Sequence, residues 1–277
     1  MYQVLDKNTI NLEIIPHLSV AKRGFKTKSC LTEIVNCILY KLKTGCQWYM
    51  LPVNSLFSQV VLNYKTVFGH FRKWCKDGSW KQTWVNLLCD KKSYLDLSSV
   101  SIDGSHTPAL RGGEEVAYQG RKKRKTTNSL YFTDSQGIPL AMSSPAAGNH
   151  HDLYQIKISL SELFEPLSKA RISLDGLFVN ADSGFDCKEF REICLSEGIF
   201  PNVDFNYRNG DNNDEDYLLD ELLYKERFTI ERTNAWMDGF RTILNRFDFT
   251  ASSWEAFNYI AFAVILLKKI KQTKKSR

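Results

Sequence analysis

The sequence predicts an α/β protein of the α+β type, in which a small helical domain precedes a mixed sheet packed by helices. Two observations carry this prediction. Residues 1–95 repeat apolar side chains at helical spacing, whereas from about residue 97 short apolar strands occur, first as a hairpin series and then alternating with helices. A chain of 277 residues is long enough to bury one large core or two ordinary ones.

The first region, residues 1–95, is expected to contain three short helices at 31–42, 64–74 and 80–88. The second of these carries cations, among them Lys65, Arg72 and Lys73, on its outer face, and Asp77-Gly78 marks a turn after it. Short helices joined by tight turns and dotted with cations suit a helix-turn-helix-like nucleic-acid-binding region. A plain helical bundle explains the same periodicity equally well, and both interpretations stay open.

The second region, residues 96–277, is expected to supply the sheet and its helices. The strands are predicted at 100–103, 130–134, 138–142, 177–181 and 199–203. A hairpin turn at Ser135-Gln136-Gly137 joins the second strand to the third. The helices are predicted at 152–167, with Asp152 as the N-cap, and at 187–196, 229–247 and 254–270.

Positive charge is concentrated in two segments of a chain whose formal net charge is +6. One is an unbroken basic run, Arg121, Lys122, Lys123, Arg124 and Lys125, within an expected insertion at 105–127 between the first two strands. The other is the segment 268–277, where six residues of ten are basic and none is acidic. One charged run is usually a solvated loop, but two separate blocks favour a phosphate-rich partner. We expect the run at 121–125 to contact phosphates.

The cysteine pattern and the hydropathy exclude several protein classes. The seven cysteines are odd in number and include no CxxC pair, so neither a disulfide framework nor a zinc site is expected. The longest apolar run, 256–267, is shorter than the ~20 residues that span a bilayer, and the N-terminus has no signal-peptide pattern. These features predict a cytoplasmic protein with reduced thiols and no membrane partner.

Two aspartates stand where apolar strands end, each closely followed by glycine. Asp103 closes the strand at 100–103, and Asp182 follows the strand at 177–181. Carboxylates at the C-terminal ends of strands face the crevice in which α/β sheets bind ligands. If the two strands are neighbours, the two carboxylates face one site and repel each other. A divalent cation that prefers oxygen ligands, Mg²⁺ or Mn²⁺, relieves this repulsion.

Glu231 is the best candidate for a third carboxylate. On its helix, Arg227, Glu231, Asn234 and Asp238 share one polar face beside the apolar stripe. Arg227, one turn earlier, is placed to orient Glu231 or to bind a phosphate. Taken singly, an Asp-Gly pair is more often a turn, and a Glu–Arg pair is more often a solvated surface pair. Only the joint placement of the three acids predicts a metal site.

Three motifs, in order along the chain, resemble those of DDE transposases of bacterial insertion sequences, in the branch with the Tyr-Arg-Glu signature. They are Ser-Ile-Asp-Gly-Ser-His at 101–106, Asn-Ala-Asp-Ser-Gly-Phe-Asp at 180–186, and Tyr-x2-Arg-x3-Glu-Arg-Thr-Asn at 224–234. The segment 44–52, with Thr-Gly-Cys-Gln-Trp and Leu-Pro, resembles the N-terminal region of the same group. The similarity covers most of the chain, and the order of the motifs makes it specific.

This resemblance implies a ribonuclease-H-like catalytic domain at 96–277 and a triad of Asp103, Asp182 and Glu231 that is both catalytic and metal-binding. The cofactor would be Mg²⁺ or Mn²⁺, as two ions. Tyr224 and Arg227 would help to place the DNA backbone.

In one position the chain departs from the family pattern. The broader signature has a lysine seven residues after the glutamate, and Asp238 occupies that position here. The usual phosphate contact is therefore in doubt, and Arg232 and Arg241 are the candidate substitutes.

The function that the resemblance implies is DNA transposition. The enzyme would bind the ends of an insertion sequence, cleave DNA, and transfer the strands to a target by metal-dependent hydrolysis and transesterification. Its partners would be double-stranded DNA, as terminal inverted repeats and target, and a second copy of the chain at synapsis; its location would be the bacterial cytoplasm, at the nucleoid. Two alternatives stay open: a transposase-derived DNA-binding protein without catalysis, and a nuclease of the same fold that does not join strands.

Overall fold

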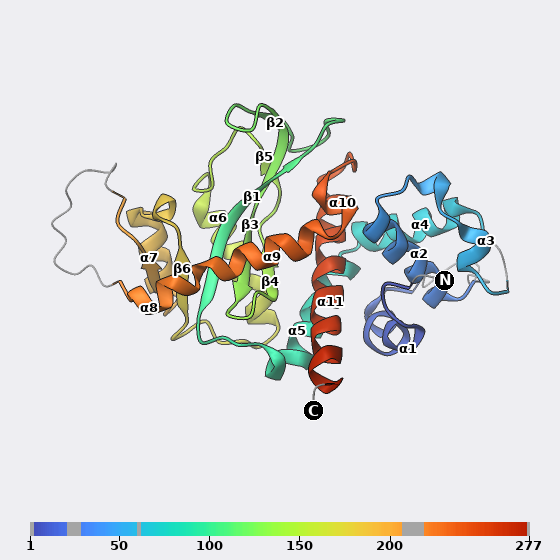
Figure 1. Ribbon diagram of the computed structural model, residues 1–277, viewed down its shortest axis with the longest axis horizontal. Helices are drawn as coiled ribbons and strands as arrows, with labels where there is room; N and C mark the ends of the chain where they lie inside the picture. Colours follow the sequence, from blue (N-terminus) through green and yellow to red (C-terminus); the bar gives the residue numbers. More distant parts are fainter. Residues whose placement is uncertain (1–2, 21–28, 60–61, 207–218, 276–277) are drawn as a thin grey trace. The chain divides into compact units, whose positions relative to one another are not determined.

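The computed structural model describes residues 3–20, 29–59, 62–206 and 219–275 (Figure 1). By packing, the chain divides into two compact units, residues 1–87 together with 236–277, and residues 88–235. The domains proposed from the sequence, 1–95 and 96–277, place the C-terminal segment with the sheet. In the structure that segment packs with the N-terminal helices, because its apolar side chains complete their core.

The first unit is helical, as predicted. Its longer helices are α2 (Leu31–Thr44), α4 (Tyr64–Lys76), α5 (Ser79–Lys91) and α11 (Ala251–Lys275), and its short ones are α1 (Lys7–Thr9), α3 (Val53–Leu56) and α10 (Arg241–Leu244). Helix α2 ends at Gly45, whose φ of 68° closes the helix in the left-handed conformation. Phe71 of α4 stacks on Phe257 of α11 with ring centroids 4.4 Å apart. Aromatic packing of this kind holds α4 against α11.

The predicted helix at 229–247 is wrong beyond residue 238. Helix α9 spans Thr229–Asp238, and α10 begins separately at Arg241. Between them the backbone turns tightly, with the N–H of Gly239 donating to the carbonyl of Trp236 and that of Phe240 to Met237. The i→i+3 bonds end the α-helix, so Arg241 does not continue the face that carries Glu231.

The second unit is built on a mixed sheet. Its strands are β1 (Val100–Pro108), β2 (Ala117–Gln119), β3 (Arg124–Asp134), β4 (Pro139–Met142), β5 (Ala146–Ala147), β6 (Phe178–Ala181) and β7 (Phe200–Val203). The order is β2-β3-β1-β6-β7, with β4 and β5 also pairing with β3. β3 runs antiparallel to β1, whereas β6 and β7 continue parallel. This central first strand, with a hairpin on one side and parallel strands on the other, is the predicted ribonuclease-H-like arrangement.

Helices cover both faces of this sheet. They are α6 (Ile156–Lys169), α7 (Lys188–Ser196), α8 (Glu221–Tyr224) and the first part of α9. Figure 1 shows α6 and α9 on opposite faces. Phe164 of α6 packs edge-on against Phe132 of β3, with ring centroids 6.2 Å apart. On the other side, the Thr233 hydroxyl of α9 donates to the carbonyl of Gly137 in the β3–β4 turn at 2.6 Å.

Strands β1 and β3, which were predicted at 100–103 and 130–134, are longer in the structure. β1 and β3 pair over nine residues, from Val100 opposite Asp134 to Pro108 opposite Thr126. The extension includes Gly104 and several polar residues, whose weak strand propensity is overridden by cross-strand pairing. The expected insertion at 105–127 is therefore partly strand, and the basic run lies at the turn between β2 and β3 and on the first residues of β3.

The predicted β3–β4 hairpin turn is confirmed. Asp134 Oδ1 accepts hydrogen bonds from the N–H groups of Gln136 at 3.0 Å and Ile138 at 2.7 Å. Gly137 has a φ of 82°, which glycine adopts without strain. None of the helices in the described ranges is long and apolar enough to cross a membrane.

Candidate active site

Asp103 and Asp182 lie on neighbouring parallel strands. β1 and β6 pair with Val100 opposite Val179 and Ser101 opposite Asn180. Continued by two residues, this register places Asp103 opposite Asp182, the first residue after β6. Neighbouring strands lie about 4.8 Å apart, and opposed residues share one face. The expectation that the two strands are neighbours is therefore confirmed. Asp103 does not end its strand as expected, because β1 continues to Pro108 by pairing with β3.

Asp103 has an unusually basic carboxylate. Burial raises its pKa to about 6, and the negative charges of Asp152 and Asp182 act in the same direction. The N–H of Gly104, which donates to Asp103 Oδ1 at 2.8 Å, and the charge of Arg227 oppose the rise. Asp182 is exposed and accepts a hydrogen bond from the N–H of Gly184 at 2.7 Å. A cation near Asp103 would offset the repulsion that its partly buried charge experiences from these neighbours.

Arg227 and Tyr224 lie near these acids, at the start of the segment that leads into α9. The Arg227 guanidinium stacks on the rings of Tyr224 and Phe228, with centroid distances of 5.5 and 5.1 Å. Arg227 Nε is buried and has no hydrogen-bond partner among the described residues. Burial raises the pKa of Tyr224, and the charge of Arg227 opposes the rise. The guanidinium is thus held in place by aromatic rings, with donor capacity left for a phosphate.

Two asparagines that the sequence analysis did not single out anchor this segment to the sheet. Asn202 of β7 donates to the side-chain oxygen of Asn180 on β6 at 2.8 Å. The same Asn202 accepts from the N–H of Asp220 at 2.9 Å and donates to its carbonyl at 3.0 Å. Asp220 in turn caps the N-terminus of α8. The buried pair therefore fixes where α8, and with it Tyr224, leaves the sheet.

Glu231 lies in the first turn of α9 and is exposed. It is not among the groups that shift the pKa of Asp103. Within the described ranges, no three His, Cys, Asp or Glu side chains converge closely enough to hold one ion. The structure thus brings Asp103 and Asp182 together, and the membership of Glu231 in the same site stays a prediction.

Comparison with protein families decides what kind of protein carries this site. The family model described as DDE superfamily endonuclease matches residues 96–268, which is more than half of the chain. The chain belongs to the DDE superfamily of endonucleases. A second model, described as putative transposase of IS4/5 family, matches residues 12–84. Together the two matches identify this endonuclease as a DNA transposase.

Other comparisons add little to this identification. No curated protein matches the chain. Among solved structures, a pre-cleavage Mos1 transpososome is similar at 9% identity and a TM-score of 0.31, over 90% of this chain and 82% of that one. A Mos1 transposase paired-end complex with the left transposon end is similar at 12% identity and a TM-score of 0.30, over 89% and 81%. At such TM-scores the likeness carries no argument about this endonuclease.

The basic run of the endonuclease is fully exposed. All five residues from Arg121 to Lys125 are open to solvent, at the turn between β2 and β3 and on the start of β3. Lys122 Nζ donates to the carbonyl of His106 at 3.2 Å, and His106 belongs to the same strand as Asp103. The run therefore carries positive charge beside and on β3, the strand that pairs with the Asp103 strand β1.

The two candidate substitutes for the missing lysine differ in their surroundings. Arg232 is exposed on α9, and its Nη1 donates to the carbonyl of Gln136 at 3.3 Å. Arg241 starts α10, beyond the break after Asp238. Arg232 lies on the same helix as Glu231, so helix geometry fixes its position relative to that acid. Arg241 lies on a separate helix, so the same argument does not apply to it.

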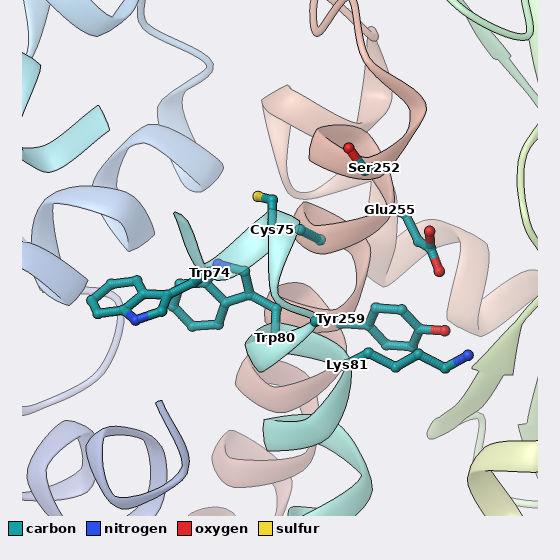
Figure 2. A pocket seen from close by; sticks show the side chains of 9 residues that line it. Trp74, Cys75, Trp80, Lys81, Ser252, Glu255 and Tyr259 are labelled. Atoms are coloured by element: carbon teal, nitrogen blue, oxygen red, sulfur yellow. The ribbon is translucent and has the colours of Figure 1, made fainter. Parts of the chain in front are cut away.

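Pockets among the described residues also lie away from the two aspartates. One of about 120 Å³ in the helical unit is shown in Figure 2, lined by Trp74, Cys75, Gly78, Trp80, Lys81, Ser252, Glu255, Ala256 and Tyr259. Glu255 is its single carboxylate, so it lacks the paired acids that the chemistry needs. A larger pocket, about 690 Å³, is lined by apolar and charged side chains, among them Phe178 at the start of β6, Arg191 and Glu221. Phe178 lies at the opposite end of β6 from Asp182.

Proposed function

We propose that this transposase binds the ends of an insertion sequence, cuts them, and joins them to target DNA, with Asp103, Asp182 and Glu231 as the catalytic and metal-binding carboxylates. The observation that carries the proposal is the register of β1 and β6, which sets Asp103 opposite Asp182. The family match over the same residues supports it, because endonucleases of this superfamily act on DNA phosphodiesters.

The acids suit Mg²⁺ or Mn²⁺. Magnesium is usually held by one or two protein carboxylates together with phosphate oxygens of the substrate, so three convergent side chains are not required in the free protein. The pKa of Asp103 is raised because burial and nearby carboxylates destabilise its negative charge. A bound cation would neutralise that charge, as expected of a cation ligand. When bound, two such ions supply Lewis-acid activation of the attacking oxygen and stabilise charge on the leaving oxygen.

The other side chains position DNA. Arg227, whose guanidinium lies over the rings of Tyr224 and Phe228, would bind a backbone phosphate near Asp103. Arg121, Lys122, Lys123, Arg124 and Lys125 would contact further phosphates along the duplex. Arg232, or Arg241, would take the role of the lysine that Asp238 replaces. Water and a DNA 3′-hydroxyl are the nucleophiles, so no covalent bond between enzyme and DNA is needed.

We assign recognition of the element ends to the N-terminal region, residues 1–95. The outward face of α4 carries the exposed cations Lys65, Arg72 and Lys76, spaced by seven and four residues, and this pattern supports a DNA-binding face. Since two ends must be joined in one reaction, two copies of the chain would meet at synapsis. The reaction would take place in the bacterial cytoplasm, at the nucleoid.

A single assay separates this function from its alternatives. The full-length protein is incubated with labelled element-end DNA, an unlabelled target and Mg²⁺, and the products are resolved on denaturing gels. We expect end cleavage followed by joining. Nicking without joining would indicate a nuclease of the same fold, and binding without cleavage would indicate a DNA-binding derivative.

The Asp103→Asn variant is the matched control for this assay. It should still shift the element-end DNA in a native gel, because the basic residues are intact, while cleavage disappears. Cleavage equal to that of the wild type would reject Asp103 as a catalytic residue.

A further inference from the structure

Asp152 does not play the role that the sequence suggested for it. The prediction that it caps the helix at 152–167 is wrong, because α6 begins at Ile156 and Gln155 precedes it with a φ of 51°. The Asp152 carboxylate lies instead against the sheet, where its Oδ1 accepts a hydrogen bond from Asn128 Nδ2 of β3 at 2.8 Å. Asn128 is almost fully buried. The carboxylate is therefore held at a defined place on the sheet.

Gly104 leaves the space that Asp152 occupies. A Cβ atom added at Gly104 would lie closer than 3.0 Å to Cγ and to both carboxylate oxygens of Asp152. Any other residue at this position would thus displace the carboxylate. Gly104 also donates its N–H to Asp103 Oδ1 at 2.8 Å. One glycine is therefore in contact with two carboxylates, one on each side of the strand, because successive positions of a strand face opposite ways.

The segment before Asp152 is tied to β3. Ala146 and Ala147 of β5 pair with Asn128 and Thr127, and the N–H of Gly148 donates to the carbonyl of Thr126 at 3.1 Å. Backbone pairing four to six residues before Asp152 limits how far its carboxylate can move away from β1. The structure therefore keeps a second negative charge next to a buried one, an arrangement that costs stability unless a cation compensates it.

We propose that Asp152 is an electrostatic positioning residue of the active centre. Because Gly104 has no side chain, the Asp152 carboxylate approaches β1 closely, and its negative charge strengthens the attraction of the Asp103 site for a divalent cation. The inference rests on the metal-dependent function proposed above. Asp152 lies on the face of β1 opposite to the Asp103 side chain, so it acts through space and touches neither the cation nor DNA. It adds a carboxylate outside the triad that the family signature names.

Binding of Mn²⁺ to the full-length protein tests this proposal directly, without DNA and without turnover. The free ion is measured by electron paramagnetic resonance during titration. Asp152→Asn removes the charge but keeps a side-chain oxygen that can accept from Asn128. We expect its Kd for Mn²⁺ to rise by about fivefold or more, as for removal of one negative charge several ångströms from a dication.

Asp175→Asn is the matched control, because it removes one charge from an exposed residue that is not among the groups acting on Asp103. Its Kd should equal that of the wild type. Equal affinities for Asp152→Asn and the wild type, or equal weakening by both variants, would overturn the inference. Asp103→Asn should weaken binding more than either. If the wild type itself binds no Mn²⁺ without DNA, the inference fails, whereas the proposed function is decided separately by the assay of end cleavage and joining, in which substrate phosphates are present.

Gly104→Ala provides an independent test that changes no charge. The added methyl group pushes the Asp152 carboxylate away from β1, so the Kd for Mn²⁺ should rise here as well. Circular dichroism and a cooperative thermal transition show that each variant is folded. A folded Gly104→Ala protein with the wild-type affinity would contradict the role given to the gap at residue 104.

Discussion

The raised pKa of Asp103 predicts an active-site variant that is more stable than the wild type when metal is removed. In the folded chain this pKa is raised from 3.8 to about 6, mainly by burial. Each pKa unit is worth ~1.36 kcal/mol, so keeping Asp103 ionised costs the folded state about 3 kcal/mol at most. Asp103→Asn removes the ionisation and with it the cost, and is expected to be more stable by up to that amount at pH 8 in EDTA.

The sign of this effect follows from the two pKa values. Below pH 3.8 the carboxyl group is protonated in both the folded and the unfolded chain, so the advantage of the variant is absent. Between pH 3.8 and about 6 only the unfolded chain loses the proton, and the wild type becomes progressively less stable relative to the variant. Above about pH 6 the difference is constant.

Urea unfolding of both proteins at intervals from pH 4 to pH 8, in EDTA, measures this difference in the free energy of unfolding. Saturating Mn²⁺ should then stabilise the wild type and close the gap, since an ion that binds only the folded chain adds to its stability. A difference that does not vary with pH, or a variant that is less stable at pH 8, would refute the explanation.

Three further predictions concern residues outside the acid cluster. Changing Lys123 and Arg124 together to alanine should weaken binding to all DNA sequences. It should also reduce the magnitude of the slope of log K against log [salt] by about 1.8, since each phosphate contact contributes ~0.9. An unchanged slope would show that the two side chains do not contact DNA phosphates. Thr233→Ala leaves the carbonyl of Gly137 without its hydrogen bond and should lower the free energy of unfolding by about 1–2 kcal/mol in a urea titration, against a Thr233→Ser control that keeps the donor. Asn202→Ala frees the start of α8 and should reduce the rate of end cleavage while the Mn²⁺ affinity stays at the wild-type value; weaker Mn²⁺ binding would contradict a role confined to placing α8.

Short-range patterns in the sequence were enough to predict much of this protein. The apolar runs of β6 and β7, the turn formed by Asp134 and Gly137, and the helical spacing in α2, α4, α5 and α11 are local properties, because each depends on residues a few positions apart. The placement of Asp182 directly after a strand is local in the same sense, whereas Asp103, expected at a strand end, lies within β1. Order and spacing of the three motifs were enough to indicate the DDE class.

Tertiary structure alone decided which of these pieces meet. The extension of β1 through Gly104 depends on pairing with a strand more than twenty residues away, and the end of α9 at Asp238 depends on a tight turn that helical periodicity does not reveal. Asp152 looks in the sequence like a helix cap, but the hydrogen bond from Asn128 and the missing side chain at Gly104 hold it against β1. Contacts between distant segments are set by the packing of the whole sheet, and no window of neighbouring residues contains that information.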